Sequence, residues 1–431
     1  MPEIGISQGF FLIFKLNDDL KNLDRFPTIL EQIIRMKKTL SLFTTLGLGI
    51  ASLHAQEHAQ MDTISAKRSS LLLNEPARAK SFQLDVLLRA GLQTDNGEGA
   101  SQAKANLDDA RILMSGEYND RLSYKVRFRL NRSFTPTSQD NGSRALDMAL
   151  IKYKFGKDLK WSVTAGKQSA MVGSYEFENN PIYEYKFTDY VDRILNLFVV
   201  GGMLSYEVNP NHSLHAQVYN TTNDSFMELH TKNGFAVGDL ERSSVPMGAY
   251  FTWVGAFMDK RFNTKWSYNI SQFAKAHTNH AVSLANKFKT AKQMLYLDLQ
   301  YSYLAVDHAM IASSAINEFY GRTGDNRVLA KDVNYSSAIL RYDQFLSKKW
   351  ELALKGGYEI AGSRDDKQLG KNFRQNWTYF AALQHKPFHN QDLRFYLGYV
   401  GNTVNYRGNM DMAKSQYNRL AFGAYFTIPV L

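Results

Sequence analysis

The feature that most constrains the fold is a strict alternation of apolar and polar residues between positions 121 and 131. Successive side chains of a β-strand point to opposite faces, so one face of this segment is hydrocarbon and the other carries hydroxyl, ammonium and guanidinium groups. Segments of the same length and period recur to the end of the chain, separated alternately by tight turns and long polar loops. This pattern predicts an all-β fold, a transmembrane antiparallel β-barrel whose polar residues face an aqueous lumen.

The alternation delimits fifteen strands directly. They are expected at 82–93, 107–117, 121–132, 145–155, 159–168, 199–208, 213–221, 246–258, 263–274, 292–303, 335–345, 349–360, 376–385, 392–403 and 417–428. Bacterial membrane barrels favour even strand numbers. The alternation of short and long connections fails only between 303 and 335, so a turn near 306–308 and a further strand at about 309–318 are expected. The prediction is a barrel of about 16 strands.

Composition favours strands over helices as the membrane-spanning segments. The mean hydropathy is −0.36 and aromatic residues make up 13% of the chain, as expected for strands with interfacial rings. Trp161, Trp266 and Trp350 each follow a short connection and are expected to form the inner aromatic girdle. A soluble β-sandwich also alternates, but the number and length of these strands fit a bilayer crossing better.

The N-terminal region predicts export. Met36-Lys37-Lys38 and the apolar stretch that follows resemble a signal peptide, assigned to 36–55, with mature protein beginning near Gln56. Residues 1–35 are interpreted as a misassigned upstream start, and a genuine cytoplasmic extension is the alternative. Residues 56–80 are expected to form a periplasmic lead-in, and 81–431 the outer-membrane barrel.

Basic side chains are frequent on the predicted lumen face. Lys125, Arg127 and Arg129 would follow one another along one wall about 6–7 Å apart. Closely spaced cations in a narrow aqueous pore lower the energy of an anion, and guanidinium pairs with two phosphate oxygens at once. The predicted pore-lining basic residues are Arg89, Arg111, Lys125, Arg127, Arg129, Lys152, Lys154, Lys160, Arg341, Lys355, Arg394 and Arg419.

Carboxylates share the same face, which leaves a second interpretation open. The basic residues would then be neutralised across strands and would not select anions. The inward-facing acids are expected to be Asp85, Asp109, Glu117, Asp298, Asp343, Glu351 and Glu359.

The segment from Ser169 to Phe198 is too long for a simple connection. One interpretation folds it into the barrel as a constriction whose carboxylates face the basic wall and create a transverse field. The alternative is an outward surface loop. The candidate constriction residues are Glu176, Glu178, Glu184, Asp189 and Asp192.

Enzymatic and nucleic-acid functions lack the necessary patterns. The chain has no nucleophile elbow, no zinc-protease motif and no phosphate-cradling glycine loop, so no catalytic residue, metal or cofactor is predicted. His277 and His280 lie in a predicted outer loop without a carboxylate at ligand spacing. The net charge of +10 is spread over strands rather than gathered in a loop with aromatic residues, which argues against nucleic acid.

Several motifs together resemble the phosphate-selective porin O and P family, particularly its Bacteroidetes branch. They are Tyr124-Lys125-Val126-Arg127-Phe128-Arg129, Leu146-Asp147, Gly166-Lys167-Gln168, and Gly173 followed by Glu176. The resemblance implies a sixteen-stranded, trimeric outer-membrane porin whose third extracellular loop narrows the pore, with Arg127 and Arg129 in the anion-guiding wall. The acidic segment and the mixed lumen depart from a phosphate-specific pattern.

The resulting hypothesis is a homotrimeric outer-membrane channel, embedded in lipid, for passive diffusion of small anionic or polar solutes, with phosphate as the favoured specific case. The alternative is a plugged structural or surface-interaction barrel that binds a partner through the predicted outer loops 224–245 and 276–291. An uptake barrel for hydrophobic ligands would need an apolar lumen or an N-terminal plug domain, and only about 25 residues separate the predicted mature start from the first strand.

Overall fold

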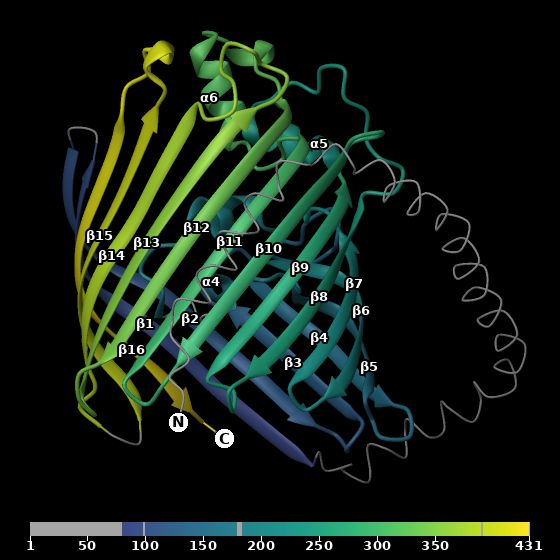
Figure 1. Ribbon diagram of the computed structural model, residues 1–431, viewed down its shortest axis with the longest axis vertical. Coiled ribbons are helices and arrows are strands. Elements are labelled where there is room, and N and C mark those ends of the chain that lie inside the picture. The colour runs from purple at the N-terminus through teal and green to yellow at the C-terminus, as the bar shows by residue number, and fades with distance from the viewer. Residues whose placement is uncertain (1–79, 98–99, 179–182, 389–390, 431) are drawn as a thin grey trace, which may run out of the picture. The chain divides into compact units, whose positions relative to one another are not determined.

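The computed structural model describes residues 80–97, 100–178, 183–388 and 391–430. Within them, sixteen strands close into a barrel in which each strand pairs antiparallel with its sequence neighbours and β1 pairs with β16 (Figure 1). The predicted barrel and its strand number are confirmed. The predicted extension, signal peptide and nearly all of the lead-in lie outside the described residues.

The strands vary in length from 8 residues in β3 to 18 residues in β2. Their bounds are β1 Ser81–Gly97, β2 Ala100–Glu117, β3 Leu122–Arg129, β4 Leu146–Phe155, β5 Trp161–Ser169, β6 Phe198–Asn209, β7 His212–Asn220, β8 Met247–Phe257, β9 Phe262–Gln272, β10 Thr278–Lys289, β11 Gln293–Val306, β12 Lys331–Phe345, β13 Trp350–Ser363, β14 Arg374–His385, β15 Asp392–Tyr406 and β16 Ser415–Pro429.

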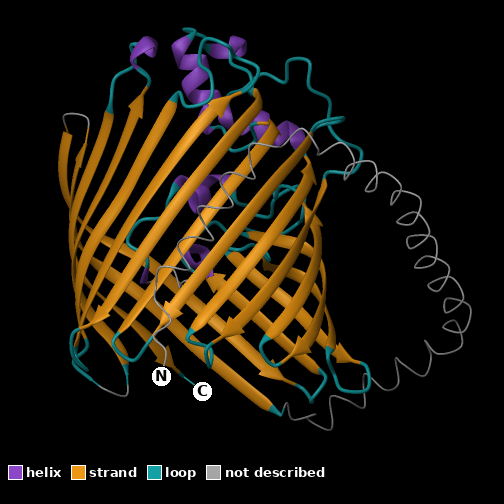
Figure 2. Ribbon diagram, viewed as in Figure 1, coloured by secondary structure: helices purple, strands orange, loops and turns teal. Residues whose placement is uncertain are grey.

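Short helices occupy the long connections of the described chain (Figure 2). Their bounds are α4 Tyr175–Glu178, the π-helical turn η4 Tyr190–Ile194, α5 Phe226–Asn233, α6 Ile311–Phe319, and the 3₁₀ turns η5 Gly324–Asn326 and η6 Gly408–Met410. The Ser225 side chain and Glu228 form a capping box at the start of α5, and Gly234 ends it in the left-handed conformation at φ 65°.

The position of the sixteenth strand was predicted wrongly. The missing strand is β10, which falls in the segment 276–291 expected as an outer loop, whereas most of the predicted strand 309–318 forms α6. Two polar residues, His280 and Asn286, lie on the outward face of β10, where apolar residues are expected. The apolar–polar alternation of this strand is therefore not evident in the sequence. In α6 the buried residues Ile311, Ala315 and Ile316 follow helical rather than strand spacing.

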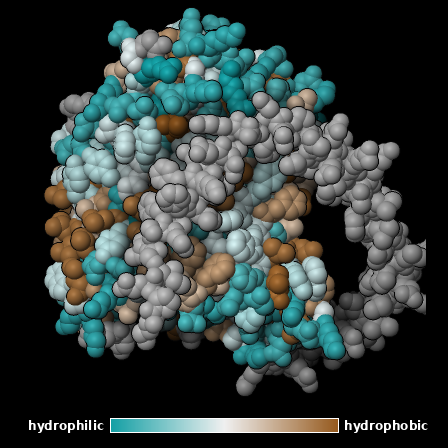
Figure 3. All heavy atoms as spheres, viewed as in Figure 1, coloured by the Kyte–Doolittle hydropathy of each residue, from teal (hydrophilic) through white to brown (hydrophobic). Residues whose placement is uncertain are grey.

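The outer face of the barrel carries an apolar belt. Large apolar side chains at alternate strand positions are exposed, and hydrophobic spheres lie between the hydrophilic loop end and the hydrophilic turn end (Figure 3). Trp161, Trp266 and Trp350 are each about 40% exposed near the short turns, as predicted for the inner girdle. Among the described residues, no helix combines the length and hydrophobicity needed to cross a membrane.

A hydrophobic core fills part of the barrel interior. Tyr190 and Val191 of η4 pack with Ile311, Ala312 and Ala315 of α6, and inward side chains of the wall complete the cluster. The connection from β5 to β6 and the connection from β11 to β12 therefore share one hydrophobic cluster.

Candidate functional site

Three arginines of the lumen wall converge on one carboxylate. Arg127 Nε lies 3.0 Å from Asp147 Oδ2, Arg129 Nε 2.8 Å from Oδ1, and Arg111 Nη1 3.6 Å from Oδ2. Asp147 is inserted between Leu146, which pairs with Phe128, and Met148, which pairs with Arg127, so the register shifts there. In a regular strand, alternation decides which face a side chain points to. An extra residue in a bulge can point its side chain to the opposite face. The bulge places Asp147 inside the barrel.

The connection between β5 and β6, residues 170–197, folds into the lumen and is called the inner loop below. Wall carboxylates hold its backbone: Asp298 Oδ2 accepts from Ser174 Oγ at 2.8 Å and from the Glu176 amide at 2.9 Å. Glu359 accepts from the amides of residues 189 and 190 at 2.8 and 2.9 Å. Backbone donors that would otherwise be buried without partners are thereby satisfied.

The acidic side chains of the inner loop pair with the wall on which the loop lies. Glu184 lies 2.9 Å from Arg341, Asp189 2.7 Å from Arg374 and Glu178 2.6 Å from Lys265, and Glu176 pairs with Lys355. These cations belong to β9, β12, β13 and β14. Asp192 is largely exposed and lies 4.0 Å from Lys186 of the same loop.

A narrow polar cavity of about 160 Å³ remains between the inner loop and the wall made by β1, β2, β3 and β16, and is called the constriction below. Five arginines and three carboxylates line it, together with one side-chain amide and two aromatic rings. The lining residues are Arg89, Asp108, Asp109, Arg111, Arg129, Asn131, Arg132, Glu184, Tyr185, Phe187 and Arg419.

Arg89 ties the inner loop to the opposite wall at the constriction. Its Nη1 donates to the Glu184 carbonyl at 2.7 Å, and its guanidinium carbon lies 4.5 Å above the Tyr185 ring. Burial raises the pKa of the Tyr185 phenol above its ordinary value, so this side chain is neutral and presents a ring face to the cation. The tip of the inner loop is thereby fixed as one rim of the passage.

A second group of cations lies nearer the short turns and is called the lysine group below. It consists of Lys125 on β3 with Lys152 and Lys154 on β4, all half-buried and on the lumen face. None of the three ammonium groups has a carboxylate within ion-pair distance in the described part of the chain. The carboxylate of Asp85 acts on Lys125 from beyond that distance, so the charge of the lysine group is compensated less closely than that of the arginines around Asp147.

The other predicted basic residues occupy different places. Arg341 and Lys355 are buried beneath the inner loop, and Arg394 pairs with Glu351 at 3.0 Å and Asp392 at 2.9 Å. Lys160 is exposed in the turn before β5. The described residues contain no cluster of three or more potential metal ligands.

Comparison with known proteins identifies the fold and the family together. The model of the phosphate-selective porin O and P family matches residues 80–428. The chain belongs to this family. It is thus an outer-membrane porin, and its barrel lies in the bacterial outer membrane. No curated protein sequence matches it.

Solved structures share the architecture of this porin at low sequence identity. The outer-membrane channel DcaP of Acinetobacter baumannii gives a TM-score of 0.56 at 12% identity over 81% of this chain and 97% of that one. The trimer form of Vibrio cholerae OmpT gives 0.50 at 12% over 81% and 100%. An anion-selective porin from Comamonas acidovorans gives 0.52 at 9% over 81% and 99%.

Sequence reasoning missed several residues that border the passage of this porin. Asp147 is part of a sequence motif, but the bulge that turns its side chain inward leaves no trace in the alternation. Asp108 sits beside another register shift, between Arg89 and Ala90, that also breaks the alternation. Arg132 follows the end of β3, where the alternation of the strand no longer applies. In each case an irregularity of the backbone, and not the alternation, sets the position of the side chain.

Proposed function

We propose that this porin conducts small anions by passive diffusion through an off-centre passage, in which solutes cross the constriction and then pass the lysine group. The observation that carries the proposal is that Lys125, Lys152 and Lys154 form no ion pair with any carboxylate of the described residues. Four acids of the inner loop pair with wall cations of β9 and β12–β14 and not with these lysines, and Asp85 acts on Lys125 from beyond ion-pair distance. A cation excess in a narrow aqueous passage favours anions.

Phosphate is the specific case that we propose to test first. Arginines 111 and 129 present guanidinium groups suited to bidentate oxygen ligands. Asp109 and Asp147 neutralise much of their charge, which favours passage over tight retention. Family membership supports phosphate as a solute, and the Comamonas acidovorans relative is described as anion-selective.

Single-channel recording of the purified protein in planar bilayers tests the proposal. In a KCl gradient we expect a reversal potential of the anion-selective sign, and added phosphate is expected to reduce the chloride current. The triple variant Lys125→Gln/Lys152→Gln/Lys154→Gln should lose most of the anion preference. The matched control Lys348→Gln/Lys349→Gln/Lys367→Gln removes three exposed charges outside the lumen and should retain it.

Other outcomes would reject the proposal. Equal reversal potentials in the lysine variant and in wild type would exclude the lysine group as the selective element. Absence of conductance would favour the plugged interaction barrel. Homotrimeric assembly, which we propose by analogy with the trimer form of OmpT, is checked by the mass of the detergent-solubilised protein.

A further inference from the structure

A second hydrophobic cluster joins three outer connections at the loop end of the barrel and is called the outer cluster below (Figure 1). Its side chains come from α5 and the segment after it, from the residues that follow β9, and from the end of β11 and the connection that follows it. They are Phe226, Leu229, Phe235, Val237, Leu240, Phe273, Ala274, Val306, Met310 and Leu329. Their packing holds α5 against the ends of β9 and β11.

His230 of α5 is buried in the outer cluster without a hydrogen bond. It is 1% exposed, and neither ring nitrogen has a hydrogen-bond partner within the described part of the chain. Its ring instead contacts aromatic rings, with centroids 4.7 Å from that of Phe226 and 6.3 Å from that of Phe273. A neutral imidazole has one N–H donor and one acceptor nitrogen, so docking of α5 leaves both of them unsatisfied and away from bulk water.

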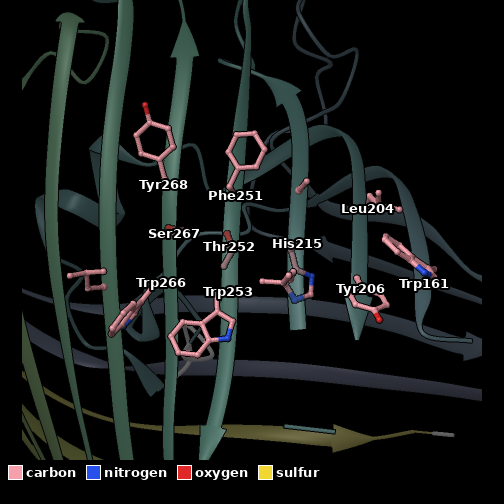
Figure 4. Close-up of a pocket in the computed structure, with 13 residues that line it drawn as sticks. Trp161, Leu204, Tyr206, His215, Phe251, Thr252, Trp253, Trp266, Ser267 and Tyr268 are labelled. Atoms are coloured by element: carbon pink, nitrogen blue, oxygen red, sulfur yellow. The ribbon is translucent and has the colours of Figure 1, made fainter. Parts of the chain in front are cut away.

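His215 of β7 shows the contrast between this environment and that of an imidazole in the barrel wall. It is one of the residues that line an apolar hollow of about 580 Å³ in the outer wall (Figure 4). Its Nε2 lies 2.8 Å from the Ser213 hydroxyl and its Nδ1 lies 2.8 Å from the Ser205 hydroxyl, so both nitrogens are paired. His230 is thus a polar group whose burial is not offset by hydrogen bonds.

Within the described chain, no charged group compensates for the burial of His230. Burial alone acts on its imidazole and holds the pKa below its ordinary value. His308 contacts the same Phe273 ring at 6.1 Å, but there the Asp307 carboxylate opposes the effect of burial. The other titratable and charged groups around the outer cluster are exposed, half-exposed or engaged with other partners: Glu228, Lys232, Asp239, Glu241, Arg242, Lys275, His277, Arg327 and Lys331.

We propose that His230 makes the docking of α5 dependent on pH, so that acidification releases this helix from the outer cluster. A released imidazole titrates in water at about pH 6.5, whereas the docked one stays neutral because burial disfavours its charge. Docking is therefore unaffected above this pH and weakens as the pH falls below it. Each further pH unit favours the released form by up to about tenfold, which amounts to about thirtyfold at pH 5.0. The device belongs to the outer connections and is independent of the selectivity of the solute passage.

Hydrogen exchange of the purified full-length protein tests the proposal, with the amides of α5 followed at pH 7.5 and pH 5.0 and their rates corrected for the intrinsic effect of pH. In wild type the protection of these amides is expected to fall by up to about thirtyfold, while the amides of β12 keep theirs. His230→Phe puts an uncharged ring into the outer cluster and should make α5 equally protected at both pH values. His277→Gln, which removes a half-exposed imidazole from the next connection, is the matched control and should respond as wild type does.

A second uncharged variant, His230→Leu, guards against a local effect of the larger ring, and heat-modifiable gel mobility shows that each variant is a folded barrel. The same loss of α5 protection in wild type and in both His230 variants would overturn the proposal and assign the response to another group, such as His308. Equal protection of α5 at the two pH values in wild type would overturn it as well, because the docked helix would then tolerate a charged imidazole.

Discussion

At the residue scale, the balance of charge in the passage depends on single carboxylates. Asp147 is 2% exposed and contacts Arg111, Arg127 and Arg129. Without it, three guanidinium groups would repel one another across a short distance. The same carboxylate that makes the arrangement stable lowers its net charge, so stability and anion preference are opposed at this position.

The variant Asp147→Asn should therefore increase anion preference and weaken the barrel. Loss of a buried acceptor from charged donors is expected to cost about 1–3 kcal/mol of unfolding free energy. Reversal potentials in a KCl gradient and urea unfolding, followed by gel mobility, measure the two effects. Asp325→Asn removes an exposed charge from an outer loop and serves as the control. Lower anion preference in Asp147→Asn would show that the residue orients the arginines for the solute rather than moderating their charge.

At the element scale, the inner loop lies where it does because one residue near its start lacks a side chain. A Cβ at Gly173 would stand 2.4 Å from the Lys265 carbonyl oxygen and 2.7 Å from that of Ser283. We expect Gly173→Ala to lift the loop from β9 and β10, at a cost of about 1–3 kcal/mol, and to increase open-channel current noise. Gly356→Ala, where the added methyl group meets open space, is the matched control. Equal noise in both variants would mean that the loop is held by its ion pairs alone.

The outer helix α6 offers a comparable test. Ala315 is 2% exposed in the core shared with η4, so Ala315→Asp buries a charge with no partner and should unfold the connection from β11 to β12. Faster trypsin cleavage at Arg322 and Arg327 would report this change. Ser314→Asp, at a half-buried position of the same helix, should leave cleavage slow. Equal cleavage of the two variants would contradict the packing of α6 described above.

These elements also show how far the sequence alone can predict the structure. Strict alternation located most strands, since period two and lipid-facing apolar residues are local properties. It failed at β10, where outward His280 and Asn286 are stabilised by cross-strand neighbours: Tyr268 for the first, Thr264 and Trp266 for the second. The pairing of the inner-loop acids depends on contacts between residues more than 75 positions apart, which no periodicity encodes.

At the scale of the whole molecule, the barrel has a filled side and an open side. The inner loop lies in the interior against β9 and β12–β14, α6 lies at the loop end of the barrel (Figure 1), and the constriction and the lysine group line the proposed passage along the other part of the wall. Because the chain contains no cysteine, single cysteines can map this asymmetry without background reaction. An open passage exposes a thiol to charged reagents, whereas packed residues exclude them.

We expect Lys152→Cys to react rapidly with a negatively charged methanethiosulfonate, with a stepwise fall in current as each channel is modified. Ser283→Cys should remain unmodified, because Ser283 is 2% exposed and its hydroxyl lies 2.8 Å from that of Tyr190 beneath the inner loop. A positively charged reagent should modify Lys152→Cys more slowly, since the neighbouring Lys125 and Lys154 repel it. Fast modification of Ser283→Cys in folded channels would show that the inner loop leaves the wall during conduction, and the passage would then be wider than the constriction implies.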